Sequence, residues 1–316
     1  MTVNRSRLFY KYAPWCLCLF FVLKAAVTGI WIVRPWDVPD EVGHFSYIKD
    51  LATGKGFPVL HETPLDKEVY ADFAPAFTRP GLNWIAQHPP LYHILMVPVY
   101  GLGSLVGTSF WGSFYLIRIV TSVFFGLGIV VLIKAFKQAG ISDVVALGSG
   151  LMLAAIPNHT YLAAAVNHDA LVFLLGSCVA YFWIRASQTL GARELFLLGL
   201  FLGLGGVVKY TFLVLIPPLV CYTAYPLWKQ RVPLKTWVTF LLPVFVPIAI
   251  WGVRNWLLLD QFLPVDTTGF RSDNPLTQSF IEFGSTYPVF SILTQSYWGL
   301  LGWMGDTNMH VRWLHL

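Results

Sequence analysis

Long apolar runs separated by short polar segments dominate the chain. A helix that crosses a membrane needs about 20 mostly apolar residues. Seven runs approach this pattern: 13–32, 114–133, 144–163, 168–184, 194–208, 210–227 and 236–257. An eighth run, 90–106, is shorter, begins at a proline and contains Pro98. It is compatible with a span or with a helix that lies at the interface. The pattern predicts an all-α, polytopic membrane helical bundle of about seven spans.

Composition supports the membrane assignment. The chain is 56% hydrophobic, only 12% charged, and has a mean hydropathy of +0.62, whereas soluble domains carry about 25% charged residues. These values exclude a disordered chain, a coiled coil and an ordinary soluble enzyme. The four cysteines lie in apolar runs without zinc-ligand spacing, so they indicate neither a disulfide framework nor a metal cluster.

The distribution of charge predicts the orientation. Basic residues favour cytoplasmic loops near the ends of spans. If 90–106 does not cross, the loops on one side carry ten basic residues and only two acids, Asp143 and Glu194. If it does cross, this pattern inverts halfway along the chain. We therefore expect 90–106 to be interfacial or re-entrant, the N-terminus to be cytoplasmic and the C-terminus to lie outside. The net charge of +5 then reflects topology, and no nucleic-acid partner is expected.

The spans predict a single membrane domain over residues 1–316, with two large extracytoplasmic segments. These are 33–112 and 254–316, and both are rich in Trp, Tyr, Pro and Asp, which suits a surface near lipid headgroups. Within 194–208, Gly199 and Gly203 form a GxxxG pattern. This pattern is typical of close helix packing, although it is also common in membrane helices in general.

An acidic motif directly follows the first span. We expect a helix over 38–53 with Asp37 as its N-cap, where acids are stabilised by the helix dipole. A chemical interpretation is also open, because Asp40 and His44 are four residues apart and share one helical face, as do Asp37 and Glu41. A carboxylate at the membrane surface can act as general base toward an acceptor hydroxyl or amine.

Several motifs together resemble the GT-C membrane glycosyltransferases. The similarity is to the protein-mannosyltransferase and aminoarabinose-transferase-like branches and to related uncharacterised bacterial membrane proteins. The motifs are Pro39-Asp40-Glu41 with His44, Gly56-Phe57-Pro58, Gln87-His88-Pro89-Pro90-Leu91-Tyr92, Asn167-His168-Asp169-Ala170-Leu171, Lys209-Tyr210-Thr211, Arg254-Asn255-Trp256 and Trp298-Gly299-Leu300-Leu301-Gly302-Trp303. Their order, and their expected placement on one side of the membrane, make the combination more specific than any one motif.

The resemblance implies a polyprenyl-phosphate-linked sugar donor and an inverting transfer to a lipid, glycan or protein acceptor. By motif position, Asp40 is the catalytic base, and Glu41 beside it is the second catalytic residue. The expected location is a cell membrane, the inner membrane of a bacterium, with the site on the extracytoplasmic side. Relatives are usually longer, with more spans and often an outer C-terminal domain, and this chain ends at Leu316. Acceptor recognition is therefore left open.

The resemblance also suggests substrate-binding residues, each with a structural alternative. His88 is a candidate for phosphate or acceptor binding, or caps a short helix. Asn167 and Asp169 face the site, or cap the next span. Lys209 and Arg254 bind the lipid-linked phosphate, or anchor helix ends at the interface. Asp37 and His44 complete the set of candidates.

No cofactor is indicated with certainty. In some relatives, acids from the first two outer loops hold a metal, so a divalent cation at Asp40 and Asp169 remains open. Two non-catalytic functions are also open, a lipid-phosphate or glycan transporter and a partner subunit of a glycosylation complex. A transporter needs charges along its path, and only Lys24 and Lys209 are candidates at membrane depth.

Overall fold

In the computed structural model, the described residues are 5–73, 81–105, 109–264, 294 and 297, and they are predominantly helical. Pro64 and Leu82 form an isolated antiparallel bridge. The helices are α1 (Arg5–Val27), the π-helix η1 (Thr28–Ile32), α2 (Glu41–Ala52), α3 (Lys67–Phe73), the 3-10 helix η2 (Trp84–Gln87), α4 (Leu91–Leu105), α5 (Ser109–Gln138), α6 (Asp143–Ala155), α7 (Pro157–Ala163), α8 (Asp169–Thr189), α9 (Ala192–Gly206), the 3-10 helix η3 (Tyr210–Leu215), α10 (Ile216–Lys229) and α11 (Leu234–Leu259).

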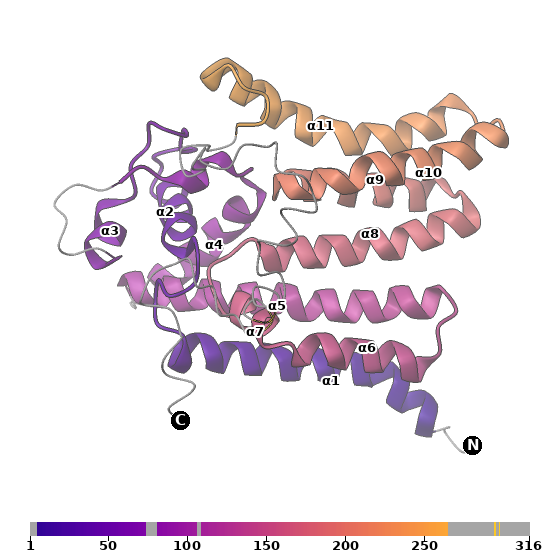
Figure 1. Ribbon diagram of the computed structural model, residues 1–316, viewed down its shortest axis with the longest axis horizontal. Coiled ribbons are helices and arrows are strands. Elements are labelled where there is room, and N and C mark those ends of the chain that lie inside the picture. Colours follow the sequence, from indigo (N-terminus) through magenta and orange to yellow (C-terminus); the bar gives the residue numbers. More distant parts are fainter. Residues whose placement is uncertain (1–4, 74–80, 106–108, 265–293, 295–296, 298–316) are drawn as a thin grey trace, which may run out of the picture.

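The long helices lie side by side in a bundle (Figure 1), with α5 between α1 and α8, and with α9 between α8 and α11. Five helical segments among the described residues are long and apolar enough to cross a membrane: Leu8–Ile32, Phe110–Gln138, Asp169–Thr189, Tyr210–Lys229 and Leu234–Leu259. The polytopic bundle is confirmed.

Five of the seven expected runs form single helical segments of membrane length among the described residues, whereas 144–163 and 194–208 form shorter helices. The run 144–163 is divided into α6 and α7, because Ile156 is extended and Pro157 has no N–H with which to continue α6. The run 194–208 forms α9, which is only 15 residues long. Both α6 and α9 still pack alongside the longer helices.

Helix α4 does not run along the bundle. Its first residue, Leu91, donates its backbone N–H to the carbonyl of Val207 just after α9. Near its other end, Gly103 packs on Ser113 at the start of α5. Both ends of α4 therefore lie at the same end of the bundle, as expected for a non-crossing helix over 90–106.

Helices α2, α3 and α4 form a cap on this end (Figure 1), and the start of α1 and the α5–α6, α8–α9 and α10–α11 connections lie at the opposite end. The basic residues of those connections are thus separated from the acidic motif by the length of the bundle. The end that faces the cytoplasm stays a prediction.

Close packing at the GxxxG pattern is confirmed. A Cβ atom added to Gly199 would overlap the carbonyl oxygen of Phe240 in α11, and one added to Gly203 would overlap that of Pro243. The Pro243 carbonyl is normally bonded by the N–H four residues later, but residue 247 is proline and has none. The bare surface of α9 therefore lets the two backbones touch at a carbonyl of α11 that has no N–H four residues later.

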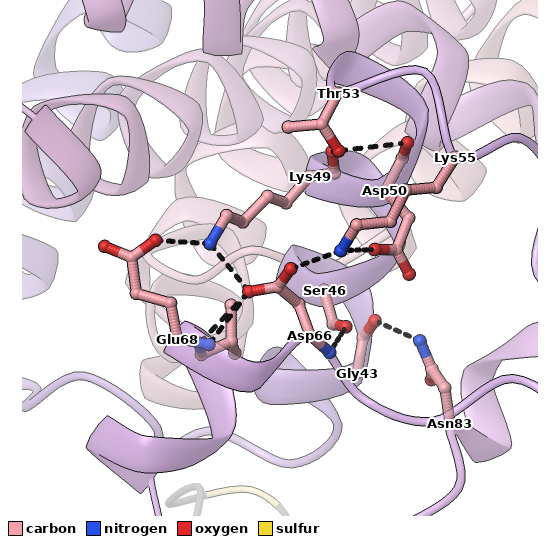
Figure 2. Close-up of polar contacts among 10 residues, drawn as sticks. Gly43, Ser46, Lys49, Asp50, Thr53, Lys55, Asp66, Glu68 and Asn83 are labelled. Atoms are coloured by element: carbon pink, nitrogen blue, oxygen red, sulfur yellow. Dashed lines mark hydrogen bonds and ion pairs between the residues drawn. The ribbon is translucent and has the colours of Figure 1, made fainter. Parts of the chain in front are cut away.

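A charge network holds the segment after α2 against the outer part of that helix (Figure 2). Asp66 receives hydrogen bonds from Lys49 and Lys55, each at 2.6 Å. Lys49 also contacts Glu68, and Lys55 contacts Asp50 at 2.9 Å. Lys49 and Asp66 are both buried, so this pair is shielded from water, whereas Lys55 and Glu68 are exposed. Together the four pairs fix the loop that leads to α3.

Candidate active site

Asp40 stands at the start of α2 in an unusual backbone conformation. Its φ is +66°, in the left-handed region, and α2 begins at Glu41 rather than at residue 38. The expected N-cap at Asp37 is wrong, because Asp37 lies in the preceding turn, where its N–H bonds the carbonyl of Arg34. The carboxylate of Asp40 turns to the indole of Trp84, whose Nε1–H donates to Oδ1 at 2.7 Å.

The surroundings of Asp40 increase its affinity for a proton. Burial raises the pKa of this carboxyl, and the negative charge of Asp169 raises it further. The Trp84 hydrogen bond and the positive charge of Lys209 lower the pKa, but the net shift is upward. A carboxylate whose pKa is raised toward neutrality is a stronger base than a solvated one. Asp40 thus has the electrostatics of a general base.

Lys209 and Asp169 form an ion pair beside Asp40. Lys209 follows the end of α9, Asp169 is the first residue of α8, and Nζ and Oδ1 are 2.6 Å apart. The Oδ1 atom of Asn167 accepts the backbone N–H of Asp169 at 2.8 Å, so Asn167 holds the first residue of α8 and orients the pair. Since an ammonium has three donors, Lys209 can contact a second anion without releasing Asp169.

Four histidines gather next to this ion pair. The Nδ1 of His44 and the Nε2 of His93 are 3.0 Å apart. The ring of His168 lies 4.5 Å from that of His44 and 4.7 Å from that of His88, measured between centroids. Burial lowers the pKa of all four, to about 4 for His88, where the charge of Lys209 also contributes. The cluster is therefore neutral at neutral pH.

Glu41 has a different environment from its neighbour Asp40. It is fully buried and receives Nε and Nη2 of Arg118 at 2.8 and 2.6 Å. The backbone N–H groups of Trp36 and Val166 also donate to this carboxylate, at 3.0 and 2.8 Å. Four donors thus bind its two oxygens, and the pair joins α2 to α5 and to the segment before α8.

Arg118 also holds the chain that leaves α1. Its guanidinium donates to the carbonyls of Gly29, Val33 and Arg34. These contacts give Arg118 a structural role at the end of the bundle that carries Asp40.

Two other candidates, Arg254 and Asp37, make contacts of their own. Arg254 donates to the carbonyls of Phe57 and Pro58 and stacks on Trp251, with 4.6 Å from Cζ to the ring centroid. Asp37 is half-buried, and its carbonyl accepts the hydroxyl of Tyr161 at 2.7 Å. Their assignment to substrate stays a prediction.

Sequence reasoning missed Trp84, His93 and His168 as members of this site. Trp84 and His93 flank the motif that contains His88, and His168 stands between Asn167 and Asp169. Proximity to recognised motifs was thus the available signal. The motif at 298–303 lies outside the described residues.

A metal site is not apparent in the described part of the chain. No group of three or more His, Cys, Asp or Glu side chains there has an arrangement that could hold a metal ion. The positive charge beside Asp40 and Asp169 in the described structure is the ammonium of Lys209.

Comparison with known proteins agrees with the fold and the motifs. A sequence profile of the dolichyl-phosphate-mannose-protein mannosyltransferase family matches residues 87–251, just over half of the chain. No curated protein sequence matches the chain.

Among solved structures, the chain is similar to one chain of the S. cerevisiae protein O-mannosyltransferase Pmt1–Pmt2 complex bound to the sugar donor. The TM-score is 0.56 and the sequence identity is 18%. The match covers 84% of this chain and 35% of that chain, so this chain spans about a third of the length of its solved relative. The resemblance to GT-C membrane glycosyltransferases is confirmed, and the chain belongs to the dolichyl-phosphate-mannose-protein mannosyltransferase family.

Proposed function

We propose that the chain transfers a sugar, in the first instance mannose, from a polyprenyl-phosphate donor to an acceptor hydroxyl, with inversion at the anomeric carbon. The acceptor belongs to a lipid, a glycan or a protein, and the reaction takes place at the extracytoplasmic face. Membership of the mannosyltransferase family supports the donor class and the reaction. Asp40 is the general base in this proposal.

The geometry of Asp40 is the observation that carries the proposal. A residue at the start of a helix normally uses its side chain to cap the helix. Asp40 instead has a left-handed backbone, and its carboxylate is held by Trp84 with a raised pKa. Backbone strain of this kind is concentrated at functional sites, where surrounding contacts maintain it. The Asp169–Lys209 pair beside it supplies an acid and a cation close to the same carboxylate.

In the proposed reaction, the acceptor oxygen attacks the anomeric carbon from the face opposite the phosphate. The bond between that carbon and the phosphate oxygen breaks, and the acceptor proton passes to Asp40. The leaving polyprenyl phosphate gains negative charge, which Lys209 stabilises. Such stabilisation of developing charge is often a large catalytic contribution. The polyprenyl tail lies among the membrane helices.

The remaining site residues position these groups. Glu41 holds the start of α2 through Arg118, and Asn167 holds Asp169 at the start of α8. His88 and His44 form the neutral wall beside Lys209, where they bind sugar or phosphate through ring N–H groups. Glu41 is thus a positioning residue in this proposal, although the motif itself suggested a catalytic one.

The test compares Asp40→Asn with Asp260→Asn in the purified protein. Both aspartates have a left-handed backbone, with φ of +66° and +54°, and asparagine tolerates this conformation. Asp260 is exposed at the end of α11, so its variant is a matched control. With radiolabelled polyprenyl-phosphate mannose, we expect Asp40→Asn to reduce turnover by about 10²–10⁴-fold, the typical contribution of a general base.

The control variant should keep wild-type turnover. Release of polyprenyl phosphate is the readout, because membrane extract can supply the acceptor without its being identified. A folded Asp40→Asn protein with near-wild-type turnover would refute the assignment of the base.

A further inference from the structure

A basic groove lies between α1 and α5, at the end of the bundle opposite Asp40. It is a cavity of about 340 Å³, and its lining includes Tyr10, Lys11, Trp15, Lys134 and Lys137. The groove belongs to the end where α1 begins and the basic connections lie. It takes no part in the proposed transfer reaction.

Two of the three lysines have no acidic partner within the described part of the chain. Lys137 forms an ion pair with Asp143, with 2.6 Å between Nζ and Oδ1. Lys134 instead lies over the ring of Trp15, 5.1 Å from its centroid, and Lys11 lies 5.3 Å from that of Tyr12. All three lysines are exposed. The groove therefore has uncompensated positive charge and favours an anion.

An apolar stripe on α1 begins at the same groove. Lys11, Trp15, Leu19 and Leu23 follow one another at intervals of four residues, so they lie along one helical face. The three apolar side chains are 48%, 60% and 57% exposed. The stripe runs from the basic end of α1 into the membrane-length segment Leu8–Ile32. A ligand on it would meet positive charge first, then an aromatic ring, and then hydrocarbon.

We propose that this groove binds an anionic phospholipid, with its headgroup phosphate between Lys11 and Lys134 and an acyl chain along Trp15, Leu19 and Leu23. Basic pockets between membrane helices bind anionic headgroups, and tryptophan favours the headgroup level. A zwitterionic lipid is less suitable because its ammonium group meets the same lysines. A free phosphate ion lacks the chain that the apolar stripe would hold.

The test measures lipid selectivity with the purified full chain by native mass spectrometry. The protein is equilibrated with equal amounts of phosphatidylglycerol and phosphatidylcholine of the same chain length. Each lysine in contact with the bound headgroup should contribute roughly a fivefold preference for anionic lipid, the value typical of a lysine at an anionic membrane surface. We therefore expect the wild type to retain phosphatidylglycerol preferentially. In Lys11→Gln/Lys134→Gln, the ratio of retained phosphatidylglycerol to retained phosphatidylcholine should fall by about 25-fold.

Lys229→Gln is the matched control, because Lys229 is an exposed lysine at the same end, in α10 and outside the groove. It should keep the wild-type preference. Leu19→Ser/Leu23→Ser should weaken retention of both lipids without changing the ratio between them, since it removes apolar contact and leaves the charges in place.

Several outcomes would overturn the proposal. The first is equal retention of the two lipids by the wild type. The second is unchanged selectivity in Lys11→Gln/Lys134→Gln, and the third is a loss of selectivity in Lys229→Gln as large as in that double variant. Displacement of phosphatidylglycerol by millimolar inorganic phosphate as completely as by short-chain phosphatidylglycerol would show a simple anion site instead. The wild-type measurement needs no variant, so a variant that fails to fold leaves the proposal falsifiable.

Discussion

The Glu41–Arg118 pair gives a quantitative test of the difference between positioning and catalysis. Glu41→Gln keeps the size of the side chain and removes its charge. Arg118 then has three carbonyl partners but no carboxylate among the described groups. The new amide NH₂ must also face N–H groups that formerly donated to Glu41, namely those of Trp36 or Val166. Donors would thus face donors in a buried site.

The expected cost follows from this geometry. Removing one partner of a buried ion pair destabilises a protein by about 3–5 kcal/mol, because the remaining charge is buried without compensation. The exposed fractions of the two side chains, 0% for Glu41 and 1% for Arg118, place the pair in this class. We expect Arg118→Met to have a similar cost, because it leaves the Glu41 carboxylate unpaired.

A double-mutant cycle separates the pair from its surroundings. The stabilities of wild type, Glu41→Gln, Arg118→Met and the combined variant are measured by thermal unfolding in detergent. The combined variant should be about 2–3 kcal/mol less destabilised than the sum of the two single variants, as is typical of residues in direct contact. Turnover at a temperature where all four proteins are folded should recover in part in the combined variant.

Two results would refute this reasoning. Additive effects, within about 0.5 kcal/mol, would mean that the pair is not coupled. A folded Glu41→Gln protein with wild-type stability but with turnover reduced as strongly as in Asp40→Asn would mean that Glu41 is itself a catalytic residue.

Three further predictions concern packing, pH and acid stability. Gly203→Ala should destabilise the protein by about 1–3 kcal/mol, because its Cβ would overlap a carbonyl of α11. Gly148→Ala should be neutral or slightly stabilising, because the space around its Cβ is open. Equal thermal unfolding midpoints of the two variants would contradict this. Lys209→Met should move the acid limb of the pH profile of kcat/KM to higher pH. The Lys209 charge lowers the pKa of Asp40, and the base must be deprotonated to act. A shift of the profile to lower pH would oppose the assignment. Burial by itself raises the pKa of Asp66, but hydrogen bonds and charges from two lysines outweigh it and lower the pKa to about 2. A carboxyl with a lowered pKa stabilises the fold above its unfolded pKa of about 4 and loses that effect as pH falls toward 2. Asp66→Asn should therefore be less stable than wild type by about 2 kcal/mol at pH 7, and this difference, measured by unfolding, should shrink between pH 4 and 2; a constant difference would contradict the shift.

Sequence alone predicted the membrane class and the bundle, and it named several of the residues that gather in the candidate site. Apolar runs of about 20 residues have few other structural solutions, so the helices could be anticipated from local pattern. Gly199 and Gly203 were also informative, because the absence of a side chain has a direct steric consequence. The division of the run 144–163 into two shorter helices was not predicted, since the effect of Pro157 within an apolar run was not recognised.

Tertiary structure decided what the neighbouring acids do. Asp40 and Glu41 are adjacent in sequence, yet one faces Trp84 and the other faces Arg118. Successive helical positions point about 100° apart, and the left-handed backbone at Asp40 changes the direction further. The side chains that contact them, those of Trp84 and Arg118, come from segments more than 40 residues away. Local sequence determines which side chains are available, but only the packing of distant segments determines that Glu41 is paired with Arg118 in the interior and that Asp40 lies near Lys209.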